Sequence, residues 1–182
     1  QNTVPVLIDP EVRCLGALPT PPDCLVDAIL AKKNLGTSID MARITIGLGP
    51  GFIAGKDVHA VIETNRGHDL GRIHYEGTAT ANTGIPAEVG GFARERVLYA
   101  PQSGPFRLHV DIGSVVEKGE LLAEIGKLPV TAPFTGLVRG ILPDGVTINK
   151  GLKIADIDPR LEARKNCWTI SDKARSTGGS VL

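Results

Sequence analysis

The first half of the chain alternates short apolar runs with polar connections. Three runs, VPVLID (4–9), CLVDAIL (24–30) and ITIGLG (44–49), are bounded by turn formers, as is typical of buried strands in an open α/β sheet. Little helical periodicity separates them, so the pattern predicts an incomplete doubly wound sheet. The chain begins at Gln1 and enters an apolar run almost at once, so we expect it to be a fragment, with part of the sheet contributed by residues before Gln1.

Two further runs alternate apolar and polar residues. VHAVIET (58–64) and GRIHYEG (71–77) are rich in β-branched residues and are joined by the polar stretch NRGHDL (65–70). This pattern predicts a hairpin with a polar tip. In such a hairpin His59 and Glu63 would share one face.

The second half of the chain repeats itself at an offset of 32 residues, with the segment 100–125 aligning on 132–157 without a gap. The identical positions are Ala100/Ala132, Pro101/Pro133, Gly104/Gly136, Arg107/Arg139, Gly113/Gly145, Lys118/Lys150, Gly119/Gly151, Ala123/Ala155 and Ile125/Ile157. Each copy places Pro and Gly where turns need them, and one copy cannot bury its apolar face alone. The repeat predicts a pseudo-symmetric β-sandwich in which Val115/Thr147 and Leu122/Ile154 are equivalent strand positions.

These patterns divide the chain into three expected parts. A partial α/β domain with a glycine-rich loop and the hairpin covers 1–92, a β domain built on the repeat covers 93–160, and a C-terminal tail covering 161–182 packs back. The expected fold class is therefore α/β plus β.

Composition and charge exclude several classes of function. The chain has 182 residues with 20 basic and 20 acidic side chains, so it lacks the cationic field expected of a protein that binds nucleic-acid phosphates. No apolar run approaches the length of a membrane span, and we expect a cytoplasmic protein with no membrane partner. Cys14, Cys24 and Cys167 match neither a disulfide framework nor a C-x-x-C metal motif, so we expect them to be structural thiols.

The stretch GLGPGFIAGKD (47–57) follows a predicted strand, where α/β sheets tend to bind ligands. Its glycines would let the backbone approach an anion, but a dinucleotide or Walker loop needs a helix to begin there, and a strand-like run follows instead. A sharp strand-to-strand connection is the simpler interpretation. If the stretch is a site, its ligand-binding residues are expected among Lys33, Asn34, Gly47, Gly49, Gly51, Gly55, Lys56, Asn65, Arg66, His68 and Asp69.

Two histidine–carboxylate pairs could in principle do chemistry. His59 with Glu63, and His68 with Asp69, combine residue types that ligate zinc or act as an acid/base pair. No spacing fixes that geometry, and the solvated face of a hairpin commonly carries such residues. We therefore predict no metal, with His59 and Glu63 as the weak candidates, and leave catalytic residues and cofactors unassigned.

The repeat resembles the biotinyl/lipoyl carrier domains, which have the barrel-sandwich hybrid fold and a modified lysine in the hairpin between two similar halves. The corresponding join here is GKLPVT, with Lys127 near the carrier position. The flanking Met-Lys-Met or Asp-Lys-Ala pattern is absent, the link is shorter, and Pro129 stiffens it. We expect the barrel-sandwich hybrid to be retained and Lys127 to be unmodified.

Longer motifs across the whole chain carry a second resemblance. The stretches DAILAKKNLGT, IGLGPGFIAGKDVHAVIETNRGHDLGR, TGIPAEVGGFARERVLYAP and TISDKARSTGGSVL are similar to the YqeB-like accessory proteins of the selenium-dependent molybdenum hydroxylase system. The resemblance implies a partial Rossmann-like sheet in the first part, because family members carry a preceding glycine-rich strand-turn-helix that this chain lacks. It also implies a role in hydroxylase maturation, in selenium or molybdenum-cofactor handling, with the apoenzyme or its cofactor as partner.

Three classes of function remain open. The first is a maturation or binding protein, with homo-oligomers possible. The second is an enzyme that acts on an anionic or nucleotide ligand at the glycine-rich loop and hairpin, and the third is a carrier charged on a lysine.

Overall fold

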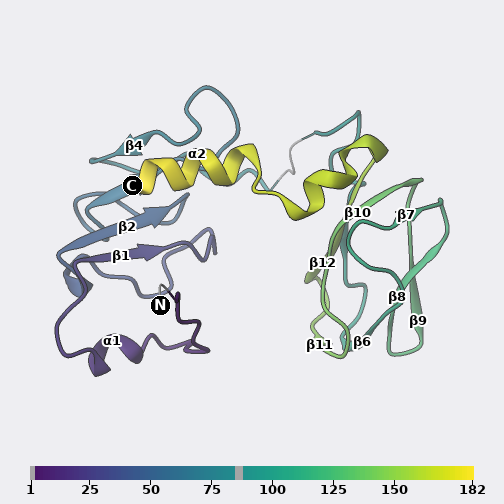
Figure 1. Ribbon diagram of the computed structural model, residues 1–182, viewed down its shortest axis with the longest axis horizontal. Helices are drawn as coiled ribbons and strands as arrows, with labels where there is room; N and C mark the ends of the chain where they lie inside the picture. The colour runs from purple at the N-terminus through teal and green to yellow at the C-terminus, as the bar shows by residue number, and fades with distance from the viewer. Residues whose placement is uncertain (1–2, 85–87) are drawn as a thin grey trace. The chain divides into compact units, whose positions relative to one another are not determined.

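The computed structural model describes residues 3–84 and 88–182, and it is built mainly from β-sheet with few helices (Figure 1). Two compact units make up the chain. One comprises Gln1–Asn82 together with Asp172–Leu182, and the other comprises Thr83–Ser171. The boundaries expected near residues 92 and 160 stay predictions.

The first unit is organised around one four-stranded sheet of order β1-β2-β3-β4. Its strands are β1 (Cys24–Asp27), β2 (Ile44–Leu48), β3 (Ala60–Ile62) and β4 (Ile73–His74). The first three are parallel, with Val26 beside Ile46 and Ile46 beside Ala60. Its described helices are α1 (Cys14–Ala17), the 3-10 turn η1 (Ile39–Met41) and α2 (Asp172–Val181).

The apolar residues of β3 and the glycine-rich connection form the core of this unit. Phe52, Ala54, Val58, Val61 and Ala79 are buried together. A Cβ on Gly47 would lie 2.5 Å from the ring of Phe52, so the absence of a side chain in β2 makes room for that ring. The glycine at this position serves packing.

The predicted hairpin is confirmed, since β4 pairs antiparallel with β3, with Val61 opposite His74. One strand prediction is wrong. The run 4–9 forms no strand, and Val4, Val6, Leu7 and Ile8 are largely exposed. Apolar character alone does not make a strand without a hydrogen-bonded neighbour, and Pro5 removes one of the donors that a ladder needs. The third parallel strand is instead β3, from the run 58–64.

The second unit contains two four-stranded sheets, of order β5-β12-β10-β7 and β11-β6-β8-β9. The strands are β5 (Val97–Tyr99), β6 (Gly104–Leu108), β7 (Val115–Val116), β8 (Leu121–Ile125), β9 (Leu128–Thr131), β10 (Gly136–Ile141), β11 (Thr147–Ile148) and β12 (Lys153–Asp158). A 3-10 helix, η2 (Leu161–Trp168), follows and packs on β10. None of the sheets in the described residues closes into a barrel, so the barrel-sandwich hybrid and Rossmann-like assignments stay predictions.

The 32-residue offset relates the two sheets strand by strand. Moving β5, β6, β7 and β8 forward by 32 residues gives β9, β10, β11 and β12, and the same shift converts one sheet order into the other read backwards. Val115 and Thr147 both begin short strands, and Leu122 and Ile154 are both buried second residues of theirs. The predicted equivalence of these positions is confirmed.

The repeat extends to hydrogen bonds and to the core. Gly119 donates its backbone N–H to Ala132, and Gly151 donates to Ala100, which is the same bond in the other copy. Two buried apolar clusters lie in this unit. Every buried member of the smaller cluster has its counterpart, 32 residues away, in the larger: Val116/Ile148, Leu122/Ile154, Ala132/Ala100, Val138/Phe106 and Ile157/Ile125. The two copies therefore bury equivalent side chains.

Candidate functional site

The carboxyl ends of β1, β2 and β3 lie at one edge of the first sheet, because the three strands are parallel. Figure 1 shows β1 and β2 as arrows pointing the same way. The loops that leave this edge begin after Asp27, Leu48 and Ile62. Open α/β sheets commonly bind ligands at such an edge, and we refer to it as the carboxyl edge.

The loop after β1 is held by side-chain hydrogen bonds. Asp27 accepts a hydrogen bond from the Thr37 hydroxyl at 2.6 Å and one from the Ile29 N–H at 3.1 Å. Asn34 accepts from the N–H groups of Gly36 and Thr37 and so closes a turn. Within this fixed loop, Leu30 and Lys32 have φ values of 59° and 66°, a conformation that costs non-glycine residues free energy.

The glycine-rich loop after β2 packs directly against the first loop. Gly51 has a φ of 113°, and a Cβ there would lie 2.5 Å from the Cα atom of Lys33. Gly49 has a φ of 82° and donates its N–H to the Ile62 carbonyl at 2.8 Å. Glycine is required at these two positions by left-handed backbone and close approach.

The loop after β3 starts with a buried carboxylate. Glu63 is only 2% exposed and accepts hydrogen bonds from the backbone N–H groups of Asn65 and Thr80, both at 2.7 Å. Burial by itself raises the pKa of Glu63, but these hydrogen bonds outweigh it and hold the pKa below its usual value. The His74 Nε2 atom lies 4.0 Å from a Glu63 oxygen and is buried without a hydrogen bond.

The tip of the hairpin is attached to helix α2 of the same unit. Arg66 forms a two-point ion pair with Asp172, in which Nη2 lies 3.0 Å from Oδ1. The hydroxyls of Ser176 and Ser180 donate to the carbonyls of Leu70 and Gly71 at 3.0 and 2.6 Å. The C-terminal helix therefore fixes the loop that follows β3.

Three cationic side chains meet at the carboxyl edge. Burial and the positive charges of Lys32 and Arg66 lower the pKa of Lys173, while Glu63 acts in the opposite direction. Neither Lys32 nor Lys173 has an ion-pair partner among residues 3–84 and 88–182. This arrangement can offset the charge of an anion. We call Lys32, Arg66 and Lys173 the cationic cluster.

The structure separates the residues singled out from the sequence. Lys33, Gly49, Gly51, Asn65 and Arg66 belong to the three loops at the carboxyl edge, and Asn34 shapes the first of them. In contrast, Gly47 lies within β2, while Gly55 and Lys56 form a turn that precedes β3 and so approach its other end. Whether any of these residues binds a ligand stays a prediction.

The candidate histidine–carboxylate pairs do not form. The Nδ1 atom of His59 lies 2.9 Å from the hydroxyl of Thr45, and Asp69 pairs with Arg72 at 2.7 Å. No group of three His, Cys, Asp or Glu side chains that could hold a metal ion occurs in the described parts of the chain. Lys127 is exposed in the two-residue turn between β8 and β9, where Ile125 pairs with Leu128.

Sequence reasoning missed Lys32, Asp172 and Lys173. Lys32 adjoins the candidate Lys33, so its place in the same loop could have drawn attention to it. Asp172 was interpreted only as a possible helix cap, because nothing in the local sequence indicates that it reaches Arg66, 106 residues earlier.

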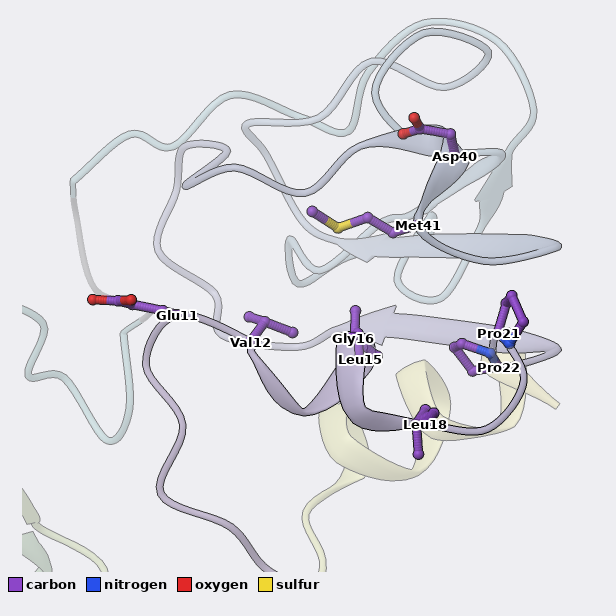
Figure 2. Close-up of a pocket in the computed structure, with 9 residues that line it drawn as sticks. All are labelled: Glu11, Val12, Leu15, Gly16, Leu18, Pro21, Pro22, Asp40 and Met41. Carbon is purple, nitrogen blue, oxygen red and sulfur yellow. The ribbon is translucent and has the colours of Figure 1, made fainter.

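A separate pocket of about 420 Å³ lies beside the segments that precede β1 and β2. Figure 2 shows apolar side chains such as Val12, Leu18 and Met41 along it, with the carboxylates of Glu11 and Asp40 far apart. Glu11 is paired with Arg13, and Asp40 accepts a hydrogen bond from Ser38. None of the ligand-binding residues expected from the sequence lines this pocket. Its chemistry therefore does not connect it with the cationic cluster.

No helix in the described residues is both long and apolar enough to cross a bilayer. The three cysteines are free thiols. These findings leave the carboxyl edge of the first sheet as the candidate functional site.

Comparison with known proteins gives one strong sequence match. The uncharacterized protein YqeB of Escherichia coli (strain K12) is 52% identical over 179 residues, which cover 98% of this chain and 32% of that protein. The chain thus spans about a third of the length of the curated relative it matches. This similarity supports a YqeB-like family. No family model matches the chain.

Comparison with solved structures gives only distant likenesses. The product-bound ectoine utilization protein EutE (DoeB) from Ruegeria pomeroyi is 24% identical with a TM-score of 0.32, and its apo structure is 26% identical with the same TM-score. Each match covers 46% of this chain and 27% of the other. At this TM-score they carry no argument about function.

Proposed function

We propose that the chain is part of an accessory protein in the maturation of selenium-dependent molybdenum hydroxylases. Two observations support this role. The long motifs at 27–37, 46–72, 83–101 and 169–182 resemble the accessory proteins of that system, and the 52% identity to YqeB extends over almost the whole chain. The proposed partner is the hydroxylase apoenzyme or its cofactor.

The observation that carries a handling role in this proposal is the cationic cluster at the carboxyl edge. Selenium in its oxidised and phosphorylated forms, and a phosphorylated cofactor, are all anionic cargo. Lys32, Arg66 and Lys173 converge where parallel strands end, and Glu63, the buried carboxylate nearby, is already occupied by two backbone N–H groups. The excess positive charge fits transient binding of an anion.

The two alternative functions have less support. An enzyme using His59 with Glu63 would need them paired, but His59 contacts Thr45 and Glu63 accepts from backbone N–H groups. A carrier would need a recognised attachment hairpin, and Lys127 lies in a tight turn without the flanking residues of carrier lysines. Neither alternative is therefore proposed.

Deletion of the gene in a host that makes such a hydroxylase tests the role. The purified hydroxylase should lose activity and cyanide-releasable selenium. Loss of selenium with molybdenum retained would support selenium delivery, and loss of both would support cofactor insertion. A hydroxylase with unchanged selenium and activity would refute the proposal.

Complementation connects the role to the site. A plasmid-borne copy carrying Lys32→Gln and Lys173→Gln should restore the hydroxylase poorly, because both changes remove positive charge from the carboxyl edge. A copy carrying Lys56→Gln is the matched control, since Lys56 lies in the turn that precedes β3. Equal rescue by both copies would remove the cationic cluster from the proposed function.

A further inference from the structure

We infer that the carboxyl edge of the first sheet is a binding site for a phosphate-class dianion, held by Lys32 and Lys173 with Arg66 beside them. This inference rests on the proposed function and adds the chemical class of the ligand. It is carried by charge, by backbone strain and by the close packing of the two loops that build the edge.

The charge balance of the edge calls for more than one negative charge. The cationic cluster brings three positive charges together, and the nearby carboxylates are Glu63 and Asp172. Asp172 is engaged by Arg66, and both oxygens of Glu63 accept backbone N–H groups. The two lysines are left to repel each other, a cost that a dianion removes more completely than a monocarboxylate.

The backbone that presents Lys32 is held in an unfavourable conformation. Val12, Leu30 and Lys32 are the non-glycine residues with positive φ among the described residues, and two of the three lie in this loop. Strained residues of this kind persist where the surroundings fix them, often at ligand sites. Here Asp27 and Asn34 supply the fixing hydrogen bonds, so Lys32 is presented by a preorganised loop.

The contact between the first two loops is also specific. Gly51 lies against the Lys33 backbone so closely that any side chain would collide with main-chain atoms. Backbone N–H groups of a glycine-rich loop and lysine side chains together are a common combination for phosphate oxygens. The geometry accordingly points to a tetrahedral oxyanion, either free or as the phosphate group of a larger cofactor.

Calorimetric titration of the full chain at low ionic strength tests the site, with inorganic phosphate and ribose 5-phosphate as the two probes. Lys173→Gln should weaken binding of the bound probe by about 10-fold or more, since a charge-assisted contact is lost. Lys32→Gln should weaken it similarly, whereas Lys56→Gln should leave the dissociation constant unchanged. Circular dichroism shows whether each variant remains folded.

The two probes distinguish the sources of the phosphate group. Equal affinities would support a free oxyanion as the ligand, and tighter binding of the ester would support a larger phosphorylated cofactor. Absence of binding by both probes, or an equal loss in Lys56→Gln, would overturn the inference.

A second readout separates binding from a structural role of Lys173. The pKa of the Lys173 amine, measured by NMR of its side-chain carbon, should rise when phosphate is added, because the anion offsets Lys32 and Arg66. A pKa that does not move at saturating phosphate would contradict direct contact. These measurements need no hydroxylase, so their failure would leave the maturation role to the deletion experiment, and the reverse also holds.

Discussion

At the scale of single residues, two carboxylates of the first unit have lowered pKa values for different physical reasons. Burial raises the pKa of Glu63, and backbone N–H donors more than compensate. Asp172 is exposed, and the hydrogen bonds from Arg66 are the main cause that lowers its pKa to about 2. The first carboxylate shapes the loop after β3, and the second attaches that loop to α2.

The Asp172 carboxyl gives a prediction about pH. Its pKa is lower in the folded protein than its ordinary value of 3.8, so the pair with Arg66 contributes stability that is complete above about pH 4. That contribution is lost as the pH falls through about 2. In Arg66→Gln the pKa of Asp172, followed by NMR of its carboxyl carbon, should rise toward 3.8.

Asp40 is the control for this measurement. Its pKa is lowered chiefly by a hydrogen bond from Ser38, so Arg66→Gln should not change it. An Asp172 titration that stays near pH 2 in the variant would show that another group stabilises the carboxylate.

At the scale of elements, helix α2 depends on the hairpin tip rather than on its own sequence. It contains Gly178 and Gly179 and has Thr177 as its buried residue, so neither propensity nor apolar burial favours it strongly. The hydroxyls of Ser176 and Ser180 instead bind the carbonyls of Leu70 and Gly71. We therefore expect the order of α2 to be sensitive to changes in the tip.

Gly71→Ala should loosen α2. A Cβ at this position would lie 2.5 Å from the Ser176 hydroxyl and 2.9 Å from that of Ser180, and the φ of 86° adds backbone strain. We expect a loss of stability of about 1–3 kcal/mol, and faster amide hydrogen exchange across α2.

Gly67→Ala provides the comparison, because Gly67 also has a positive φ, of 141°, but no atom lies within 4 Å of a Cβ built there. This variant should show backbone strain without faster exchange in α2. If both variants release the helix equally, strain in the tip, and not the contact with the serines, holds α2 in place.

At the scale of the whole molecule, the second unit is a duplicated structure in strands, hydrogen bonds and core. One difference between the copies is a bulge. The register of β10 against β12 shifts between Val138 and Gly140, whereas β6 pairs with β8 from Phe106 to Leu108 without a shift. Arg139, the residue at the shift, lies 3.9 Å from the buried Asp158, which Arg160 also binds.

Equivalent core positions should have comparable energetic weight. Leu122→Ala and Ile154→Ala each remove a fully buried side chain, so each should lower the free energy of unfolding by about 2–5 kcal/mol in urea denaturation. The exchange of the exposed equivalents, Val115→Thr and Thr147→Val, should change it by only about 0.5 kcal/mol. A large cost in one copy and none in the other would show that the copies do not share the load of the core.

The sequence by itself determined the duplicated unit and two strands of the first sheet. The repeat was readable because turn glycines, prolines and buried positions recur at a fixed offset, and each acts over a few residues. The same local signals located β1 and β2 and the pairing of β3 with β4, but they also suggested a strand at 4–9, because periodicity cannot tell whether a run has a partner.

Only the tertiary structure decided where the candidate site lies. The parallel pairing of β3 with β2 brings the loop of Arg66 to the edge that Lys32 occupies, and the docking of α2 adds Lys173 from the far end of the chain. The same pairing puts Lys56 before β3 and so apart from that loop, although the two are close in sequence. Contacts between distant segments are set by strand order, register and helix packing, which no local pattern contains.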